Sequence, residues 1–353
     1  MQPSSPPKWG PILIVGGSGR LGYFIAQCLL QQPECATVVS ISRSSQIAHP
    51  CPGVAYRVAD IQDRDALSKV LHDVQPETII NCAAPAHTNT TTPASQFEKV
   101  FVTGQDTLMA LARQVGSTRY MICTTSSSVI AGYNHVLADE MAPLWSDDSS
   151  AFPYWVQRAR AEKRLLASDS AAFQTVSLRL PLIIGEREYA FVPAMLKTLE
   201  DGNTGVQIGR DRGLLATVSA GDAARAHVLA LRAVMRLGND VHGEAFYITG
   251  KEDLSFWTMA RIIWEEAGWR RDKPPFVMPD WVAWLMAALS EMLLWPVGIE
   301  PQLTLHMVRF MCNTWTYDGT KARDRLGYVP EDDTEEELRK GVRWHLHQSK
   351  HTD

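Results

Sequence analysis

Short apolar runs alternate with longer amphipathic segments along the first half of the chain. Helical periodicity marks the longer segments, of which 94–116 is the clearest. The apolar runs are rich in β-branched residues and nearly continuous, as expected of parallel strands that are buried on both faces. They lie at 11–15, 36–42, 54–60, 77–84, 119–126 and 175–185. The pattern predicts an α/β fold with a doubly wound parallel sheet covered by helices.

The second half of the chain is less regular. We expect a smaller, mixed α/β lobe, some of whose strands and helices return to the main domain. The expected strands lie at 204–209 and 244–250, and the expected helices lie around 255–268, 279–295 and 334–347. We therefore expect four parts along the chain: a loose N-terminal tail (1–10), a main domain (11–185), a C-terminal lobe (186–347) and a C-terminal tail (348–353).

The composition is that of an ordinary globular protein, with 45% hydrophobic residues, 21% charged residues and a net charge of −5. Without a basic surplus there is no reason to expect nucleic acid as a partner. The histidines are scattered, so we expect no metal site. The six cysteines show no paired spacing, which favours reduced thiols in a reducing compartment. The first ten residues lack the apolar segment of a signal peptide, which favours a cytoplasmic location.

Tryptophan is concentrated late in the chain, since eight of the eleven lie beyond residue 250. The stretch 281–299 is nearly apolar, but Ser290, Glu291 and Pro296 interrupt it. It is short and broken for a membrane span. Three interpretations stay open: the stretch forms a pocket wall or core, it lies in a membrane interface as a peripheral contact, or it spans the membrane.

A glycine-rich segment, VGGSGRLG, lies between the first expected strand and the first expected helix. Glycines at this junction allow a tight turn, and the backbone N–H groups and the helix N-terminus can then bind a pyrophosphate. The segment predicts that 11–185 is a Rossmann domain that binds a dinucleotide. The expected cofactor-binding residues here are Gly16, Gly17, Ser18, Gly19, Arg20, Leu21 and Gly22.

The end of the second strand bears on the choice between NAD(H) and NADP(H). An acidic residue at this position normally binds the ribose hydroxyls, but here the chain has Ser42 and Arg43. Without that carboxylate nothing repels a 2′-phosphate, and Arg43, together with Arg20, could pair with it. NADP(H) is therefore favoured, although Arg43 as a solvated side chain would leave either cofactor acceptable. Asp60 and Ile61, after the third strand, are expected to meet the adenine.

The chain resembles the extended short-chain dehydrogenase/reductases from Pro11 to about Trp344. Within them it is most similar to the branch of 3β-hydroxysteroid dehydrogenases and sterol-4α-carboxylate 3-dehydrogenases (decarboxylating). The segments that carry the resemblance are VGGSGRLG, NCAAPA, TTSSSV, PYWVQRARAE, LRLPLIIG, GDAARAHVLAL, FYITGKEDLSFWTMARIIWEEAG and YDGTKARDRLGYVP.

The resemblance implies roles for individual residues. Ser126 would bind the substrate oxygen, with Thr125 as the competing choice, and Tyr154 would be the general acid/base. Asn81, Ala83 and Ala84 would lie along the cofactor, and Pro181 and Leu182 beside the nicotinamide.

One residue departs from the family's pattern. The family has lysine four positions after the tyrosine, where it binds the nicotinamide ribose, lowers the pKa of the tyrosine and joins a proton relay. Here the residue is Arg158, which can perform the first two tasks but holds its proton too tightly for easy relay. Lys163 would face the other side of the helix. Phe101 stands where relatives often carry a structural asparagine.

Three outcomes therefore stay open: a retuned dehydrogenase or reductase, a non-redox isomerase or epimerase that uses Tyr154, or a cofactor-sensing relative without turnover. Reduction should suffer less from the arginine than oxidation. The resemblance implies a lipophilic polycyclic substrate, such as a sterol or triterpenoid, which is oxidised at a 3β-hydroxyl and decarboxylated at a neighbouring carboxylate. It also implies a homodimer, and exposed apolar surface in 281–299 would favour contact with the endoplasmic reticulum face.

Overall fold

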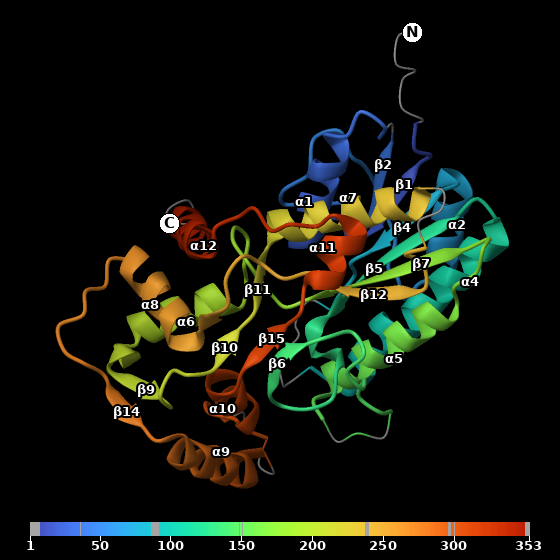
Figure 1. Ribbon diagram of the computed structural model, residues 1–353. Helices are drawn as coiled ribbons and strands as arrows, with labels where there is room; N and C mark the ends of the chain where they lie inside the picture. Colours follow the sequence, from blue (N-terminus) through green and yellow to red (C-terminus); the bar gives the residue numbers. More distant parts are fainter. Residues whose placement is uncertain are drawn as a thin grey trace.

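The computed structural model describes residues 8–35, 37–85, 92–147, 149, 151–236, 240–295, 298–299 and 301–349. Seven parallel strands form the central sheet, in the order β12-β7-β5-β4-β1-β2-β3 (Figure 1). The predicted α/β fold with a doubly wound parallel sheet is confirmed. The strands of the sheet are β1 (Ile12–Val15), β2 (Val38–Ser42), β3 (Ala55–Val58), β4 (Thr78–Asn81), β5 (Tyr120–Ser126), β7 (Gln174–Leu180) and β12 (Glu244–Tyr247).

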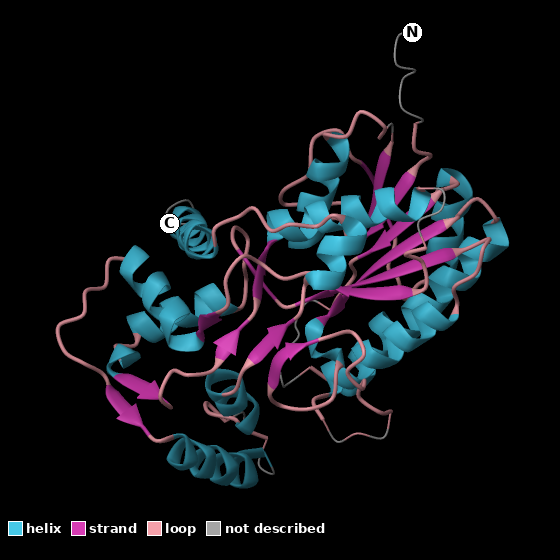
Figure 2. Ribbon diagram, in the orientation of Figure 1, coloured by secondary structure: helices cyan, strands magenta, loops and turns pink. Residues whose placement is uncertain are grey.

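Successive residues of β1 face opposite sides of the sheet, and each side has its own core. Ile12 and Ile14 pack in one cluster with residues of α1 (Arg20–Leu30) and α7 (Ala220–Met235). Leu13 and Val15 pack in another with residues of α2 (Arg64–Val74), α4 (Gln105–Val115) and α5 (Pro153–Ala167). Figure 2 shows the helices on both sides of the central strands. Burial on both faces explains the nearly continuous apolar runs.

The smaller lobe contains short strands and five helices. Its largest sheet has the order β13-β10-β15-β6, and two strand pairs, β8 with β11 and β9 with β14, accompany it. These strands are β6 (His135–Ala138), β8 (Leu182–Ile184), β9 (Val206–Ile208), β10 (Leu214–Leu215), β11 (Thr217–Ser219), β13 (Leu254–Ser255), β14 (Phe276–Met278) and β15 (Trp315–Tyr317). The helices are α6 (Phe191–Glu200), α8 (Phe256–Glu266), α9 (Asp280–Leu294), α10 (Leu305–Cys312) and α12 (Thr334–Ser349), while α11 (Thr320–Leu326) lies against α7.

One sequence prediction of a single element was wrong. The run 175–185 is two strands, because Pro181 separates β7 from β8 and has no N–H to donate to a ladder. β8 then leaves the central sheet and pairs with β11. The expected helix 94–116 is confirmed: it begins as α3 (Ala94–Phe97), passes through the π-helical segment η1 (Glu98–Gly104) and continues as α4.

Helix α9 packs through one narrow face and exposes most of its apolar side chains. Ala283 and Ala287 are fully buried, and they pack with Val308 of α10. The exposed large side chains of this helix are Trp281, Trp284, Leu285, Met286, Leu289, Met292 and Leu293. Among the described residues, no helix combines the length and hydropathy needed to cross a bilayer. Most of the large apolar side chains of α9 are thus exposed, which is unusual for a core helix.

Candidate active site

A cavity of about 490 Å³ opens at the carboxyl ends of the central strands. In doubly wound sheets this is the edge where ligands bind. The cavity is lined by residues from the glycine-rich segment, the ends of β2, β4 and β5, and the start of α5. Of the residues expected from the sequence, it brings together Gly16, Ser18, Gly19, Arg20, Leu21, Gly22, Ser42, Arg43, Asp60, Ile61, Ala83, Ala84, Ser126, Tyr154, Arg158 and Pro181.

The glycine-rich turn is packed too closely for side chains at two of its glycines. A Cβ on Gly17 would lie 2.2 Å from Ser40 Oγ, and one on Gly22 would lie 2.4 Å from the Gly17 Cα. Gly16 has φ +92°, which L side chains rarely adopt. Gly19 is the N-cap of α1, so the unpaired N–H groups of the helix begin at the cavity. These features fit the pyrophosphate of a dinucleotide.

Arg20 lines the cavity but already has an anionic neighbour. Its Nη1 lies 3.8 Å from Oε1 of Glu188, which precedes α6. Burial lowers the pKa of Arg20 to about 10, against the opposing attraction of Glu188. Its Nε and Nη2 are buried and have no hydrogen-bond partner within the described chain. The ion pair gives Arg20 a partner other than the 2′-phosphate considered from the sequence.

The ends of β2 and β3 define another wall of the cavity. Ser42 is buried, and its Oγ accepts a hydrogen bond from the backbone N–H of Ser44 at 3.3 Å. Arg43 is exposed and forms no ion pair with any described residue. Asp60 Oδ1 accepts from the backbone N–H of Gln62 at 2.9 Å, and Gln62 also lines the cavity. No carboxylate lies at the end of β2 to repel a phosphate.

The two competing hydroxyls at the end of β5 have different surroundings. Thr125 is 4% exposed, and its Oγ1 donates to Glu162 Oε2 at 2.9 Å and lies 2.9 Å from Ser177 Oγ. Ser126 is half-buried, and its Oγ lies 2.7 Å from Ser128 Oγ. Because the Thr125 hydroxyl is committed to a buried network, the geometry favours Ser126 as the hydroxyl that meets a substrate.

Tyr154 and Arg158 lie one turn apart on α5, and both line the cavity. The Tyr154 ring packs edge-on against the rings of Phe97 and Phe101, with centroids 5.7 and 5.6 Å away. Nη1 of Arg158 donates to the backbone carbonyl of Thr124 at 2.9 Å, and its Nε is buried without a hydrogen-bond partner among the described residues. The spacing of the sequence motif therefore places both side chains at one cavity.

Three expected residues do not line the cavity. Gly17 lies behind the turn against Ser40, Leu182 lies in β8, and Asn81 accepts a hydrogen bond from the backbone N–H of Ala83 through its Oδ1 at 3.2 Å. Tyr189 and Val100 line the cavity, but nothing in the sequence singled them out. They reach the cavity only through the packing of the chain, so no local motif could have identified them.

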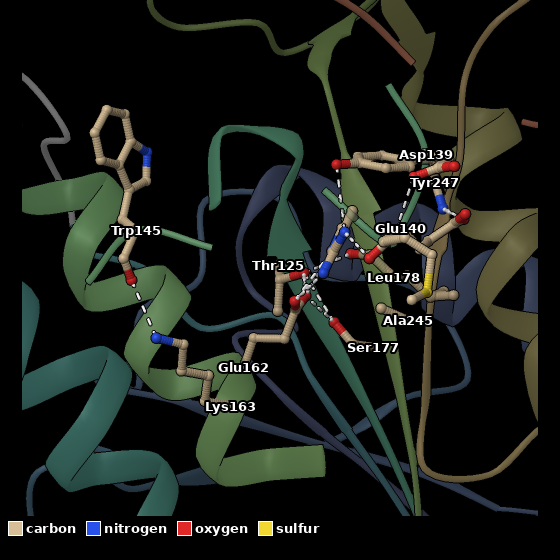
Figure 3. A network of polar contacts seen from close by, with 12 residues as sticks. Thr125, Asp139, Glu140, Trp145, Glu162, Lys163, Ser177, Leu178, Ala245 and Tyr247 are labelled. Carbon is tan, nitrogen blue, oxygen red and sulfur yellow. Dashed lines mark hydrogen bonds and ion pairs between the residues drawn. The ribbon is translucent and has the colours of Figure 1, made fainter. Parts of the chain in front are cut away.

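A buried polar network lies at the carboxyl end of β5, around Thr125 (Figure 3). Glu162, two turns after Tyr154 on α5, is fully buried, and its Oε1 lies 2.6 Å from Nη2 of Arg179. Its Oε2 accepts from Ser177 Oγ at 2.7 Å. Lys163 reaches the other way and donates to the Trp145 carbonyl at 3.2 Å. Lys163 is thus no replacement for a lysine at position 158.

The fold and the cavity define a dinucleotide-dependent oxidoreductase of the short-chain type. The profile of the 3-beta hydroxysteroid dehydrogenase/isomerase family matches residues 13–278, and the chain belongs to this family. The chain is accordingly an NAD(P)-dependent enzyme that acts on CH–OH groups, and the resemblance found in the sequence is confirmed.

Three known proteins illustrate the relationship. The chain is 26% identical to sterol-4-alpha-carboxylate 3-dehydrogenase erg26, decarboxylating, of Schizosaccharomyces pombe, over 96% of this chain and 98% of the relative. It is 29% identical to 2-alkyl-3-oxoalkanoate reductase of Stenotrophomonas maltophilia, over 93% and 97%. The crystal structure of UDP-glucose 4-epimerase from Thermotoga maritima superposes with a TM-score of 0.73 at 19% identity, over 96% and 99%, which is a likeness of fold.

Proposed function

We propose that this protein is an NADP(H)-preferring oxidoreductase that acts on a hydroxyl or keto group of a lipophilic polycyclic substrate such as a sterol or triterpenoid. The observation that carries the proposal is the meeting of Ser126, Tyr154 and Arg158 at the cavity that the glycine-rich turn also lines. A hydroxyl, a phenol and a fixed cation at one end of the parallel sheet are the groups that carbonyl–alcohol interconversion requires.

Each of the three side chains would have its own role in the reaction. Ser126 hydrogen-bonds the substrate oxygen, and Tyr154 gives or takes the proton on that oxygen. Arg158 holds the nicotinamide ribose and keeps positive charge beside the phenol. A dinucleotide held by the glycine-rich turn would supply the hydride acceptor or donor. Because a guanidinium releases its proton far less readily than an ammonium, Arg158 does not relay the proton onward, and the reductive direction suffers least from the substitution.

The relatives support a substrate with a carboxylate next to the reacting carbon. The name of the S. pombe enzyme places a carboxylate on the carbon beside the one that is dehydrogenated, and the name of the S. maltophilia enzyme describes a 3-oxo acid. In both, the oxo group lies β to the acid. Oxidation of such a hydroxy acid here would yield a β-keto acid, which loses carbon dioxide readily to leave the ketone.

The preference for NADP(H) is supported by the end of β2. Ser42 and the exposed Arg43 line the cavity where a ribose-binding carboxylate would otherwise lie. A guanidinium pairs well with a 2′-phosphate through charge-assisted hydrogen bonds.

Contact with a membrane surface is supported by the exposed apolar face of α9. Arg270, Arg271 and Lys273 are exposed in the segment that leads through β14 into this helix. Phe276 and Val277 of β14 are also exposed. Apolar side chains next to basic ones suit a bilayer with anionic headgroups, such as the endoplasmic reticulum face. A lipophilic substrate would reach the enzyme from the same phase.

The test is a turnover assay that follows reduced-nicotinamide absorbance with NADP(H) or NAD(H) and a panel of 3-hydroxy and 3-oxo steroids and triterpenoids, with and without a 4-carboxylate. Turnover that Tyr154→Phe abolishes supports the proposal. Dinucleotide binding without any change in absorbance, together with substrate isomerisation, would instead establish non-redox chemistry.

A further inference from the structure

The ring of Phe101 contacts both side chains on which the proposed chemistry depends. It lies in the π-helical turn η1 and is 3% exposed. The guanidinium carbon of Arg158 lies 3.7 Å from its centroid, and the Tyr154 ring meets it edge-on at an interplanar angle of 80°. Phe97 stacks against the same ring at 11°. Phe101 is therefore held in place while it contacts the acid/base residue and the adjacent cation.

The guanidinium depends on this ring because it has few other partners. Arg158 is 9% exposed, and one terminal nitrogen of its guanidinium, Nη1, donates a hydrogen bond to the Thr124 carbonyl. Its Nε is buried, with no acceptor among the residues that the structure describes. A separation of 3.7 Å places the guanidinium over the face of the ring, where a dehydrated cation is attracted most strongly.

We infer that Phe101 is a positioning residue for the reaction. Its ring fixes the plane of the Arg158 guanidinium, which keeps the positive charge at the cavity beside Tyr154. A lysine ammonium has no plane to stack and carries its charge as a compact point. The ring at position 101 consequently matches an arginine at position 158 better than it would match a lysine there.

The inference is tested with Phe101→Leu, which keeps an apolar side chain and removes the π face, and with Phe101→Tyr, which retains the face. Phe173→Leu is the matched control, because Phe173 is similarly buried and lies under another guanidinium, with the Arg113 guanidinium carbon 4.4 Å from its centroid. Among the ring contacts of the described residues, Phe173 has none with Phe101, Tyr154 or Arg158. The measurements are the dissociation constant for NADPH, the pH dependence of kcat/KM with a substrate found as above, and thermal stability. The kinetic readout rests on the proposed function, whereas the binding readout does not.

We expect Phe101→Leu to weaken NADPH binding about tenfold and to displace the pH profile, and we expect Phe101→Tyr to restore both to within about threefold. Phe173→Leu should lower thermal stability and leave binding and the pH profile unchanged. If Phe101→Leu lowers only stability, or if Phe173→Leu alters binding and the pH profile as much, Phe101 is merely a core residue and the inference is wrong.

A second comparison uses Arg158→Lys. If ring and guanidinium act together, Phe101→Leu should change NADPH affinity far less in the Arg158→Lys background than in the native chain. Equal effects in the two backgrounds would show that the ring acts independently of the guanidinium, and would overturn the inference. Each variant is compared as purified full-length protein whose cooperative unfolding shows that it has folded.

Discussion

Arg179 and Glu162 form an ion pair with almost no access to water, at exposures of 3% and 0% for the two side chains. The pair joins β7 to α5. Glu162 also accepts a hydrogen bond from the hydroxyl of Thr125, which precedes Ser126 in β5. The helix that carries Tyr154 and the strand that carries Ser126 are thus tied to one buried carboxylate. The relative position of Ser126 and Tyr154 depends on this carboxylate.

Removing one member of this pair should be strongly destabilising. Arg179→Met leaves the Glu162 carboxylate buried without its cation, and we expect a loss of about 3–5 kcal/mol in the free energy of unfolding. Glu162→Gln combined with Arg179→Met should recover a substantial part of that loss. Denaturant unfolding measures both.

Lys197→Ala serves as the control, because it breaks the solvent-exposed pair with Asp201 and should change the free energy of unfolding only slightly. If Arg179→Met changes the free energy of unfolding as little as Lys197→Ala does, the buried ion pair does not stabilise the fold as predicted.

The cofactor choice should depend on Arg43. Arg43→Ala removes the charge that would pair with a 2′-phosphate, so we expect NADPH affinity to fall by about 10- to 100-fold. NADH affinity should change less than about twofold. Titrations that follow the fluorescence of the reduced nicotinamide measure both constants. Arg57→Ala, on exposed β3 and outside the cavity, is the matched control. Equal losses for the two cofactors would show that Arg43 does not discriminate between them.

Stability should fall between pH 6.5 and pH 4 because of buried His227. Burial lowers the pKa of His227 to about 4. Its Nδ1 donates to the Ala223 carbonyl, and its Nε2 accepts from the Thr124 hydroxyl 2.8 Å away. The unfolded chain, with an ordinary histidine pKa of about 6.5, binds the proton first. The contribution of His227 to the free energy of unfolding is therefore complete above pH 6.5. It is lost as the pH falls toward 4, by about 3 kcal/mol.

Urea unfolding at a series of pH values measures this dependence. His227→Gln should be less stable at neutral pH, and its stability should decline less steeply below pH 6.5. His72→Gln, on the exposed face of α2, should leave the slope unchanged. A native slope identical to that of His227→Gln would rule out His227 as the source.

Membrane binding should depend on the outer face of α9. Trp284→Glu with Leu293→Glu places two charges where 47% and 63% of these side chains are exposed, so the fold should survive. We expect the native protein to sediment with vesicles that contain phosphatidylserine and the double variant to stay in the supernatant. Val329→Glu, which charges an exposed apolar residue between α11 and α12, is the control. Equal sedimentation of all three proteins would refute the membrane contact.

Local patterns predicted the parts of the site that local structure creates. The glycine-rich turn lies within one loop, and Tyr154 and Arg158 lie four residues apart on one helix. Motifs of this kind can be recognised from the sequence, and both line the cavity. The buried partner of Thr125 is different, because Glu162 meets it only when α5 packs on β5 and β7. Sequence alone could not have separated Thr125 from Ser126 on that ground.

Other features depend on the packing of distant segments. Tyr189 enters the cavity wall from the connection between β8 and α6, and the stacking of Phe101 under Arg158 depends on the π-helical turn η1. Neither position has a local motif, because each is set by how distant segments of the chain pack together. Pro181 did carry a signal for the break between β7 and β8, but the apolar residues on both sides of it concealed the change of sheet.

Strand β12 has a consequence for how the chain is made. It pairs with β7 at the edge of the central sheet, although it lies more than sixty residues later in the chain, at Glu244–Tyr247. A nascent chain that has emerged from the ribosome only as far as β7 therefore presents an open edge with unpaired N–H and C=O groups, which other chains can join. The dinucleotide-binding half cannot complete its own sheet during synthesis and must wait for a strand from the second half.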